Sequence, residues 1–209
     1  VMYALSKAAN IRKNSNGEYA ILGIPYAQYL KGEFDFAKNI RIDYRNSFAF
    51  HAGVGIAVPY GNAKTIPFEK QYFSGGANSV RDLGPGSFAG NGNLLDQSGD
   101  IKLDASIEYR SKLFWKFQGA VFIDAGNIWT IRSYANQPGG VFKFDRFYKQ
   151  IAVAYGLGLR LDLDFFILRF DGGMKAVNPA YETRKEHFPI IHPKFSRDFA
   201  FHFAVGYPF

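Results

Sequence analysis

Few residues of this sequence have the types and spacing that chemistry requires. The 209 residues include four histidines and no cysteine, so disulfides and thiolate metal sites are excluded. His51 and His202 fall on the polar sides of predicted strands. Neither has neighbours at the spacing of a metal centre or an activated nucleophile, so we interpret both as hydrogen-bonding groups. No serine, histidine and aspartate combination resembles a catalytic triad. We therefore predict no catalytic residue, no metal, no cofactor and no enzymatic activity.

The most distinctive polar residue is Arg81, which follows a glycine-rich stretch inside a long connection, residues 60–100. Glycine costs backbone entropy and proline removes a hydrogen-bond donor, so residues 72–86 are predicted to form neither helix nor ladder strand. A connection of this length is uncommon in a folded protein unless it is functional or disordered. Its aromatic residues favour a structured loop that packs against the rest of the chain, with Arg81 at its tip.

The elements that must position this loop are predicted to be β-strands. Apolar and polar residues alternate along most of the chain, and a strand places alternate side chains on opposite faces. The pattern predicts eight strands, over residues 1–8, 30–44, 48–58, 101–109, 115–125, 150–162, 166–171 and 197–209. Residues 9–25 are predicted to form a loop. The connections alternate between long and short, so every long loop falls at one end of the strands and every tight turn at the other.

Composition indicates where these strands fold. The chain has 22 Phe and 13 Tyr, yet its mean hydropathy is slightly negative, which is typical of the alternating strands of a membrane β-barrel. It contains no apolar run of about 18 residues, so no transmembrane helix is predicted. The polar strand faces carry both signs of charge in nearly equal number, which favours salt bridges around a plug over an ion-selective pore. The net charge of +7 is not gathered into a basic cluster with stacking aromatics, so we predict no nucleic-acid partner.

The alternative is a soluble β-sandwich or lipocalin-like barrel. Two features weigh against it. Gly53, Gly55, Gly156 and Gly158 lie on the polar face, where glycine is expected if a plug approaches the wall and unexpected on a solvated exterior. The last strand, residues 197–209, places an apolar row on one face. That row includes Phe201, Phe203, Val205, Tyr207 and Phe209, with Gly206 and Pro208 between its last members. We therefore predict an all-β, transmembrane antiparallel β-barrel.

Several motifs of this chain resemble those of one family. Residues 75–81 resemble the loop-six motif of the BamA/TamA-type outer-membrane insertase superfamily, also called the bacterial surface antigen family. The matching residues are Gly75, Gly76, Asn78, Val80 and Arg81. Phe122, Asp124 and Gly126 match its Phe-x-Asp-x-Gly motif, residues 156–160 are similar to its penultimate-hairpin pattern, and the final apolar row looks like its β-signal. Asp82 and Leu83 follow Arg81 where the family has a glycine and an aromatic. Either the motif is degenerate or residues are missing at this point.

The resemblance implies a function as well as a fold. The eight strands would be the C-terminal half of a sixteen-stranded barrel, with the N-terminal half-barrel and periplasmic POTRA domains absent. Arg81 would pair with Asp124 and hold loop 60–100 inside. Function would be insertion or translocation of proteins through a laterally opening barrel, with the seam at the last strand. The alternative is a complete eight-stranded barrel with structural or adhesive loops.

The resemblance also implies partners and a location. Partners would be unfolded outer-membrane clients, the lipid bilayer with lipopolysaccharide, and accessory lipoproteins or other assembly-complex subunits. The location would be the bacterial outer membrane, with long loops extracellular and short turns and C-terminus periplasmic. BamA-type and TamA-type proteins are not separated by these residues.

Overall fold

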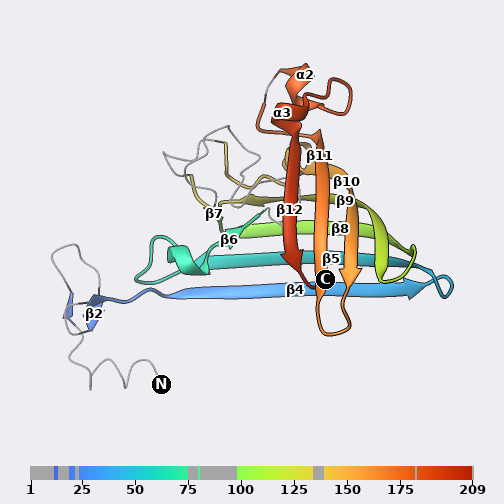
Figure 1. Ribbon diagram of the computed structural model, residues 1–209. Helices are drawn as coiled ribbons and strands as arrows, with labels where there is room; N and C mark the ends of the chain where they lie inside the picture. The colour runs from blue at the N-terminus through green and yellow to red at the C-terminus, as the bar shows by residue number, and fades with distance from the viewer. Residues whose placement is uncertain are drawn as a thin grey trace.

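One antiparallel sheet dominates the computed structural model, which describes residues 12–13, 19–21, 24–74, 80, 98–133, 139–181 and 183–208. The sheet has seven strands, and each pairs with its neighbour in the chain. They are β4 (Tyr29–Arg41), β5 (Asn46–Pro59), β8 (Ile101–Lys112), β9 (Phe117–Trp129), β10 (Ala152–Asp162), β11 (Ile167–Val177) and β12 (Phe199–Val205). The strand direction turns through a large angle from β4 to β12 (Figure 1). Such twist and coiling are expected of a curved barrel wall.

The seven strands confirm the antiparallel β prediction, while their bounds differ from it. The first predicted strand, residues 1–8, lies outside the described residues. Strand β9 runs on to Trp129, which pairs with Ile101, so the Phe-x-Asp-x-Gly motif lies wholly within a strand. Strand β11 continues to Val177, beyond the predicted end at residue 171. Strand β12 is shorter than predicted and ends at Val205.

Short elements occupy two segments predicted to be loop. Strands β1 (Arg12–Lys13), β2 (Tyr19–Ile21) and β3 (Ile24–Pro25) form a small sheet within residues 9–25. Strand β6 (Tyr72–Phe73) pairs with β7 (Ser98–Gly99), which corrects the prediction that residues 72–86 contain no ladder strand. The two ends of the long loop are thereby joined.

Four helical turns complete the described chain. These are η1 (Phe68–Lys70), η2 (Phe147–Gln150), α2 (Arg184–His187) and α3 (Phe195–Asp198). None of the helices in the described part of the chain is long and apolar enough to span a membrane.

The sheet has two chemically distinct faces, as the alternation predicts. On one face, here the outer face, apolar side chains such as Ile107, Ile123 and Leu157 are exposed. On the other, the inner face, Glu108, Asp124 and other charged side chains are buried. A sheet that exposes its apolar side and buries its charged side is inverted relative to a soluble protein, and this arrangement fits a wall between lipid and a polar interior.

Candidate functional site

Val80, the one described residue between Ser74 and Ser98, is seated on the inner face. It is 1% exposed and packs against Ala152 and Ala154 of β10. A Cβ added at Gly126 of β9 would lie 2.6 Å from the Leu103 carbonyl oxygen of β8 and 3.0 Å from Val80 Cγ2, so the neighbouring strand and the loop together leave room only for glycine there. The seat therefore consists of one glycine and two alanines on neighbouring strands.

Asp124 lies beside this seat. It is fully buried in β9 and is opposite Ala154 in the register of β9 with β10. Its other neighbour is Ser106 of β8. Arg81 follows Val80 directly in the chain, but it and Gly75, Gly76 and Asn78 lie outside the described residues. The Arg81–Asp124 pair remains a prediction, and the seat of Val80 supports it because successive Cα atoms are only about 3.8 Å apart.

A buried network of charges occupies the same face. Arg160 donates from Nη1 to Asp171 Oδ1 at 2.6 Å and from Nη2 to Glu108 Oε2 at 2.9 Å. Arg110 Nε lies 2.7 Å from Glu108 Oε1, and Arg169 Nε lies 3.1 Å from Asp171 Oδ2. The network joins β8, β10 and β11 through three arginines and two carboxylates. Such pairing specifies register, because each ion would be costly to bury alone.

Glycines on the inner face make room for large side chains. A Cβ at Gly158 would overlap Arg160 and Asp171, and a Cβ at Gly156 would overlap both the ring of Phe122 and the Gly172 carbonyl oxygen of β11. Phe122 is only 1% exposed, so it belongs to the inner face together with Asp124. The glycine spacing of residues 156–160 thus has a physical reason, which is that Arg160 lies flat across the sheet. The sequence did not predict these specific ion pairs. The signal that could have indicated them is the alternation of Gly156 and Gly158 before Arg160.

The start of the long loop is anchored on β4 and β5. The Tyr72 ring covers Gly55, where an added Cβ would lie 2.5 Å from ring atom Cζ. Its hydroxyl donates to the Gly32 carbonyl at 3.2 Å, and Lys31 Nζ lies 4.2 Å from the ring centroid. Burial, together with nearby Glu33, raises the pKa of Tyr72 to about 12, so the hydroxyl keeps its proton at neutral pH. Nearby, His51 Nε2 lies 2.7 Å from Asp35 Oδ2, which agrees with its predicted hydrogen-bonding role.

The end of the long loop is fixed at Asp100. This residue is fully buried, and its backbone N–H donates to Trp129 O at 2.7 Å. Its Oδ2 accepts a hydrogen bond from the Ile131 backbone N–H at 3.0 Å. Burial raises the pKa of the Asp100 carboxyl, and that hydrogen bond and Arg132 partly oppose the shift. Both ends of the loop are therefore held against the wall.

Strand β12 forms one edge of the sheet. It pairs with β11 from Met174 opposite Phe199 to Leu168 opposite Val205, and no other described strand pairs with it. Phe201, Phe203 and Val205 are exposed on the outer face, as predicted. The strand carries polar backbone groups on an edge that is open within the described residues.

The chain leaves the outer face immediately after β12. Gly206 has φ +92°, a conformation that other residues rarely adopt. The Tyr207 hydroxyl then donates to Gln118 Oε1 at 3.2 Å, and the Arg110 guanidinium carbon lies 4.5 Å from the Tyr207 ring centroid. The prediction that Tyr207 continues the outer apolar row is therefore wrong. Pro208 follows Tyr207, and Phe209 lies outside the described residues.

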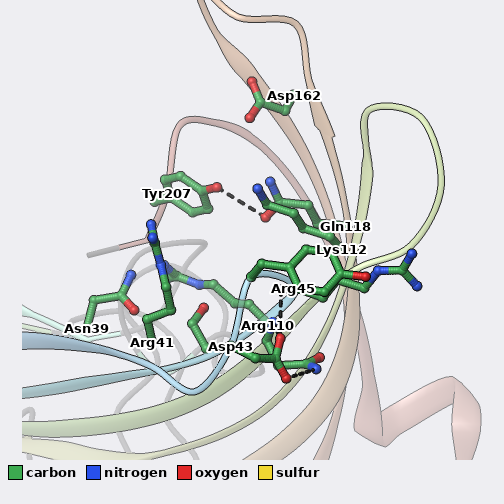
Figure 2. A pocket seen from close by; sticks show the side chains of 12 residues that line it. Asn39, Arg41, Asp43, Arg45, Arg110, Lys112, Gln118, Asp162 and Tyr207 are labelled. Atoms are coloured by element: carbon green, nitrogen blue, oxygen red, sulfur yellow. Dashed lines mark hydrogen bonds between the residues drawn. The ribbon is translucent and has the colours of Figure 1, made fainter.

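Tyr207 closes one side of a polar pocket of about 590 Å³ at the short-turn end (Figure 2). Arg41, Arg45 and Lys112 line it and form no salt bridge within the described part of the chain. Asp43 and Asp162 also line the pocket, where they face these three cations and Arg110, so positive charge is in excess. This end of the inner face is therefore positively charged.

Tyr72, Val80 and Asp100 hold the described parts of the long loop against the wall. Within the described ranges, no three histidine, aspartate or glutamate side chains are grouped to hold a metal ion. A sheet with an apolar outer face, buried inner charges and a loop seated on its inner wall defines a wall segment of the outer-membrane β-barrel class.

The comparisons with known proteins identify the family. The Omp85 superfamily domain matches residues 11–209, so the chain belongs to the Omp85 superfamily. This membership indicates the bacterial outer membrane as its location.

Two BamA proteins illustrate the similarity. The outer membrane protein assembly factor BamA of Neisseria meningitidis is 34% identical over 95 residues, which are 39% of this chain and 11% of that protein. The crystal structure of BamA from Haemophilus ducreyi lacking POTRA domains 1–3 matches 86% of this chain and 35% of that one. Its TM-score is 0.60 and its sequence identity 18%, so it supports the fold alone. The chain thus spans only a small part of each relative. The Neisseria protein is by name an assembly factor. Membership of the Omp85 superfamily agrees with the prediction of a non-enzymatic protein.

Proposed function

We propose that this chain is the C-terminal half of a sixteen-stranded outer-membrane insertase barrel, with a further half-barrel and POTRA domains upstream. Its clients would be unfolded outer-membrane proteins, and accessory lipoproteins or other assembly subunits would dock on it. The coverage of only part of each BamA relative supports this reading over a complete eight-stranded barrel.

The observation that carries the proposal is the edge of β12. This strand has seven residues against eleven in β11, and Gly206 turns the chain inward directly after it. A short edge strand that meets a strand from the other half of the barrel would form the weakest seam of the wall. Opening there would expose backbone groups to which a client strand can add by β-augmentation, without nucleotide or metal.

A reversible cross-link tests the seam. These 209 residues contain no cysteine, so within them only the engineered cysteine responds to oxidation. One cysteine replaces Ala204 of β12, and the other replaces the facing residue on the first strand of the full-length protein. Ala204 is chosen because its small side chain contributes little packing. We expect oxidation to abolish client insertion into vesicles and reduction to restore it.

The matched control locks strands that are already paired. Cysteines at Met174 and Phe199 are opposite each other in the β11–β12 ladder, so their disulfide leaves the seam free. This control should keep its activity when oxidised. Full insertion activity with the seam locked would rule out lateral opening.

A further inference from the structure

The connection between β11 and β12 ends in a preformed structure, residues 183–198, here called the cap. It contains α2 and α3 and lies beyond the long-loop ends of β11 and β12 (Figure 1). Arg197 Nε donates to Asp198 Oδ1 at 2.6 Å, and Arg197 Nη1 donates to Glu186 Oε1 at 3.2 Å. Burial alone would raise the pKa of Asp198, but hydrogen bonds from Arg197 and the Lys194 backbone lower it overall. The cap thus has internal polar contacts that fix its shape at neutral pH.

The surface of the cap is unusually apolar for an exposed loop. Ile190 is 57% exposed, Ile191 is 60% exposed and Phe195 is 68% exposed. The three lie within six consecutive residues, with polar or proline residues between them. Large exposed apolar side chains this close together in the sequence mark a segment that contacts an apolar partner.

That surface is continuous with the lipid-facing side of the sheet. The rings of Phe195 and Phe199 are stacked with centroids 4.3 Å apart and an interplanar angle of 15°. Phe199 begins the outer row of β12, which continues through Phe201 and Phe203. Because this row faces lipid in an outer-membrane protein, the stacked Phe195 extends the same apolar surface past the end of the strand.

Cations accompany the apolar residues of the cap. Arg184, Lys185 and Lys194 are exposed and form no salt bridge among the described residues. The acidic side chains of this segment are already engaged, since Glu186 and Asp198 both bind Arg197. Exposed apolar side chains beside unpaired cations are typical of segments that lie in the interface of a phosphate-bearing membrane.

We propose that the cap is a lipid-binding element that enters the leaflet at the long-loop end beside β12. Ile190, Ile191 and Phe195 occupy the acyl-chain boundary of that leaflet. Arg184, Lys185 and Lys194 bind its phosphate groups. The cap thereby ties the outer end of the edge strand to lipid. This inference uses the outer-membrane location and does not depend on client insertion.

A single fluorescent label tests the apolar part of the proposal. The full-length protein carries Ile191→Cys labelled with an environment-sensitive dye and is reconstituted in phosphatidylcholine vesicles with brominated acyl chains. We expect a blue-shifted emission and strong quenching, as for the same label at Phe203→Cys on the outer face of β12. A label at Asp145→Cys in another long loop, where the side chain is 70% exposed, is the water-facing control.

Charge reversal tests the phosphate part. Adding phosphatidylglycerol should increase quenching at Ile191, and the combined variant Arg184→Glu, Lys185→Glu and Lys194→Glu should lose that increase. The matched control reverses Lys64, Lys70 and Lys143, which are exposed cations outside the cap, and should retain it.

Two outcomes would overturn the proposal. A label at Ile191 that behaves like the one at Asp145, while the one at Phe203 is quenched, would show that the cap faces water or a protein. Equal dependence on phosphatidylglycerol in the cap variant and its control would show that the cations bind no lipid phosphate.

Discussion

At the scale of single residues, glycine makes room for large side chains to pack on the inner face. Arg160 crosses Gly158 to reach Asp171, and Tyr72 covers Gly55 in the same way. In each case the hydrogen that replaces a side chain leaves space for a long polar or aromatic neighbour. Local β propensity would disfavour these glycines, so their contribution is tertiary.

Replacing Gly158 should therefore destabilise the wall. Gly158→Ala would place a Cβ against Arg160 and Asp171. We expect the overpacking and the displaced ion pairs to lower the free energy of unfolding by about 1–3 kcal/mol. Denaturant unfolding of the reconstituted protein measures this change in the free energy of unfolding.

The control for this substitution is Gly32→Ala in β4, where an added Cβ meets nothing within 4 Å. It should change stability by no more than about 0.5 kcal/mol. If both variants unfold at the same denaturant concentration, Arg160 is not held against Gly158.

At the scale of elements, the described parts of the long loop pack against the wall. Its two ends pair as β6 and β7, Tyr72 packs on β5, and Val80 packs on β10. These contacts are separated along the chain by residues outside the described ranges, yet each meets the inner face. Arg81, the next residue after Val80, would add a charged anchor by pairing with Asp124.

Charge reversal tests that anchor. Arg81→Glu and Asp124→Arg should each make residues 72–90 accessible to added protease while the barrel remains assembled, because each leaves a buried charge unpaired at a cost of about 3–5 kcal/mol. The double variant should recover part of the protection, since a direct pair is restored with opposite polarity. Additive losses in the double variant would show that the two residues do not interact.

At the scale of the whole molecule, the connections separate into two sets. The short turns between β4 and β5, β8 and β9, and β10 and β11 fall at one end, and the long connections fall at the other. In outer-membrane barrels the long loops face outward, so we expect this chain to have the same orientation. The basic pocket and Tyr207 would then face the periplasm.

Cysteine labelling on cells tests this orientation. Asp145→Cys, in a long loop, should react with a membrane-impermeant thiol reagent on intact cells. Phe165→Cys lies in the short turn before β11, where the side chain is 84% exposed, and should react only after the outer membrane is opened. The reverse pattern would invert the topology.

The sequence by itself determined which face of each strand is apolar and where the long connections lie. It could do so because side chains of a strand alternate with a period of two, a local property of the chain. The tertiary structure decided the rest. Glu108 binds Arg160 from 52 residues away, and only the register of β8, β9 and β10 brings the two together. The inward turn at Gly206 was also invisible to alternation, because one positive φ moves Tyr207 from the outer row to Gln118.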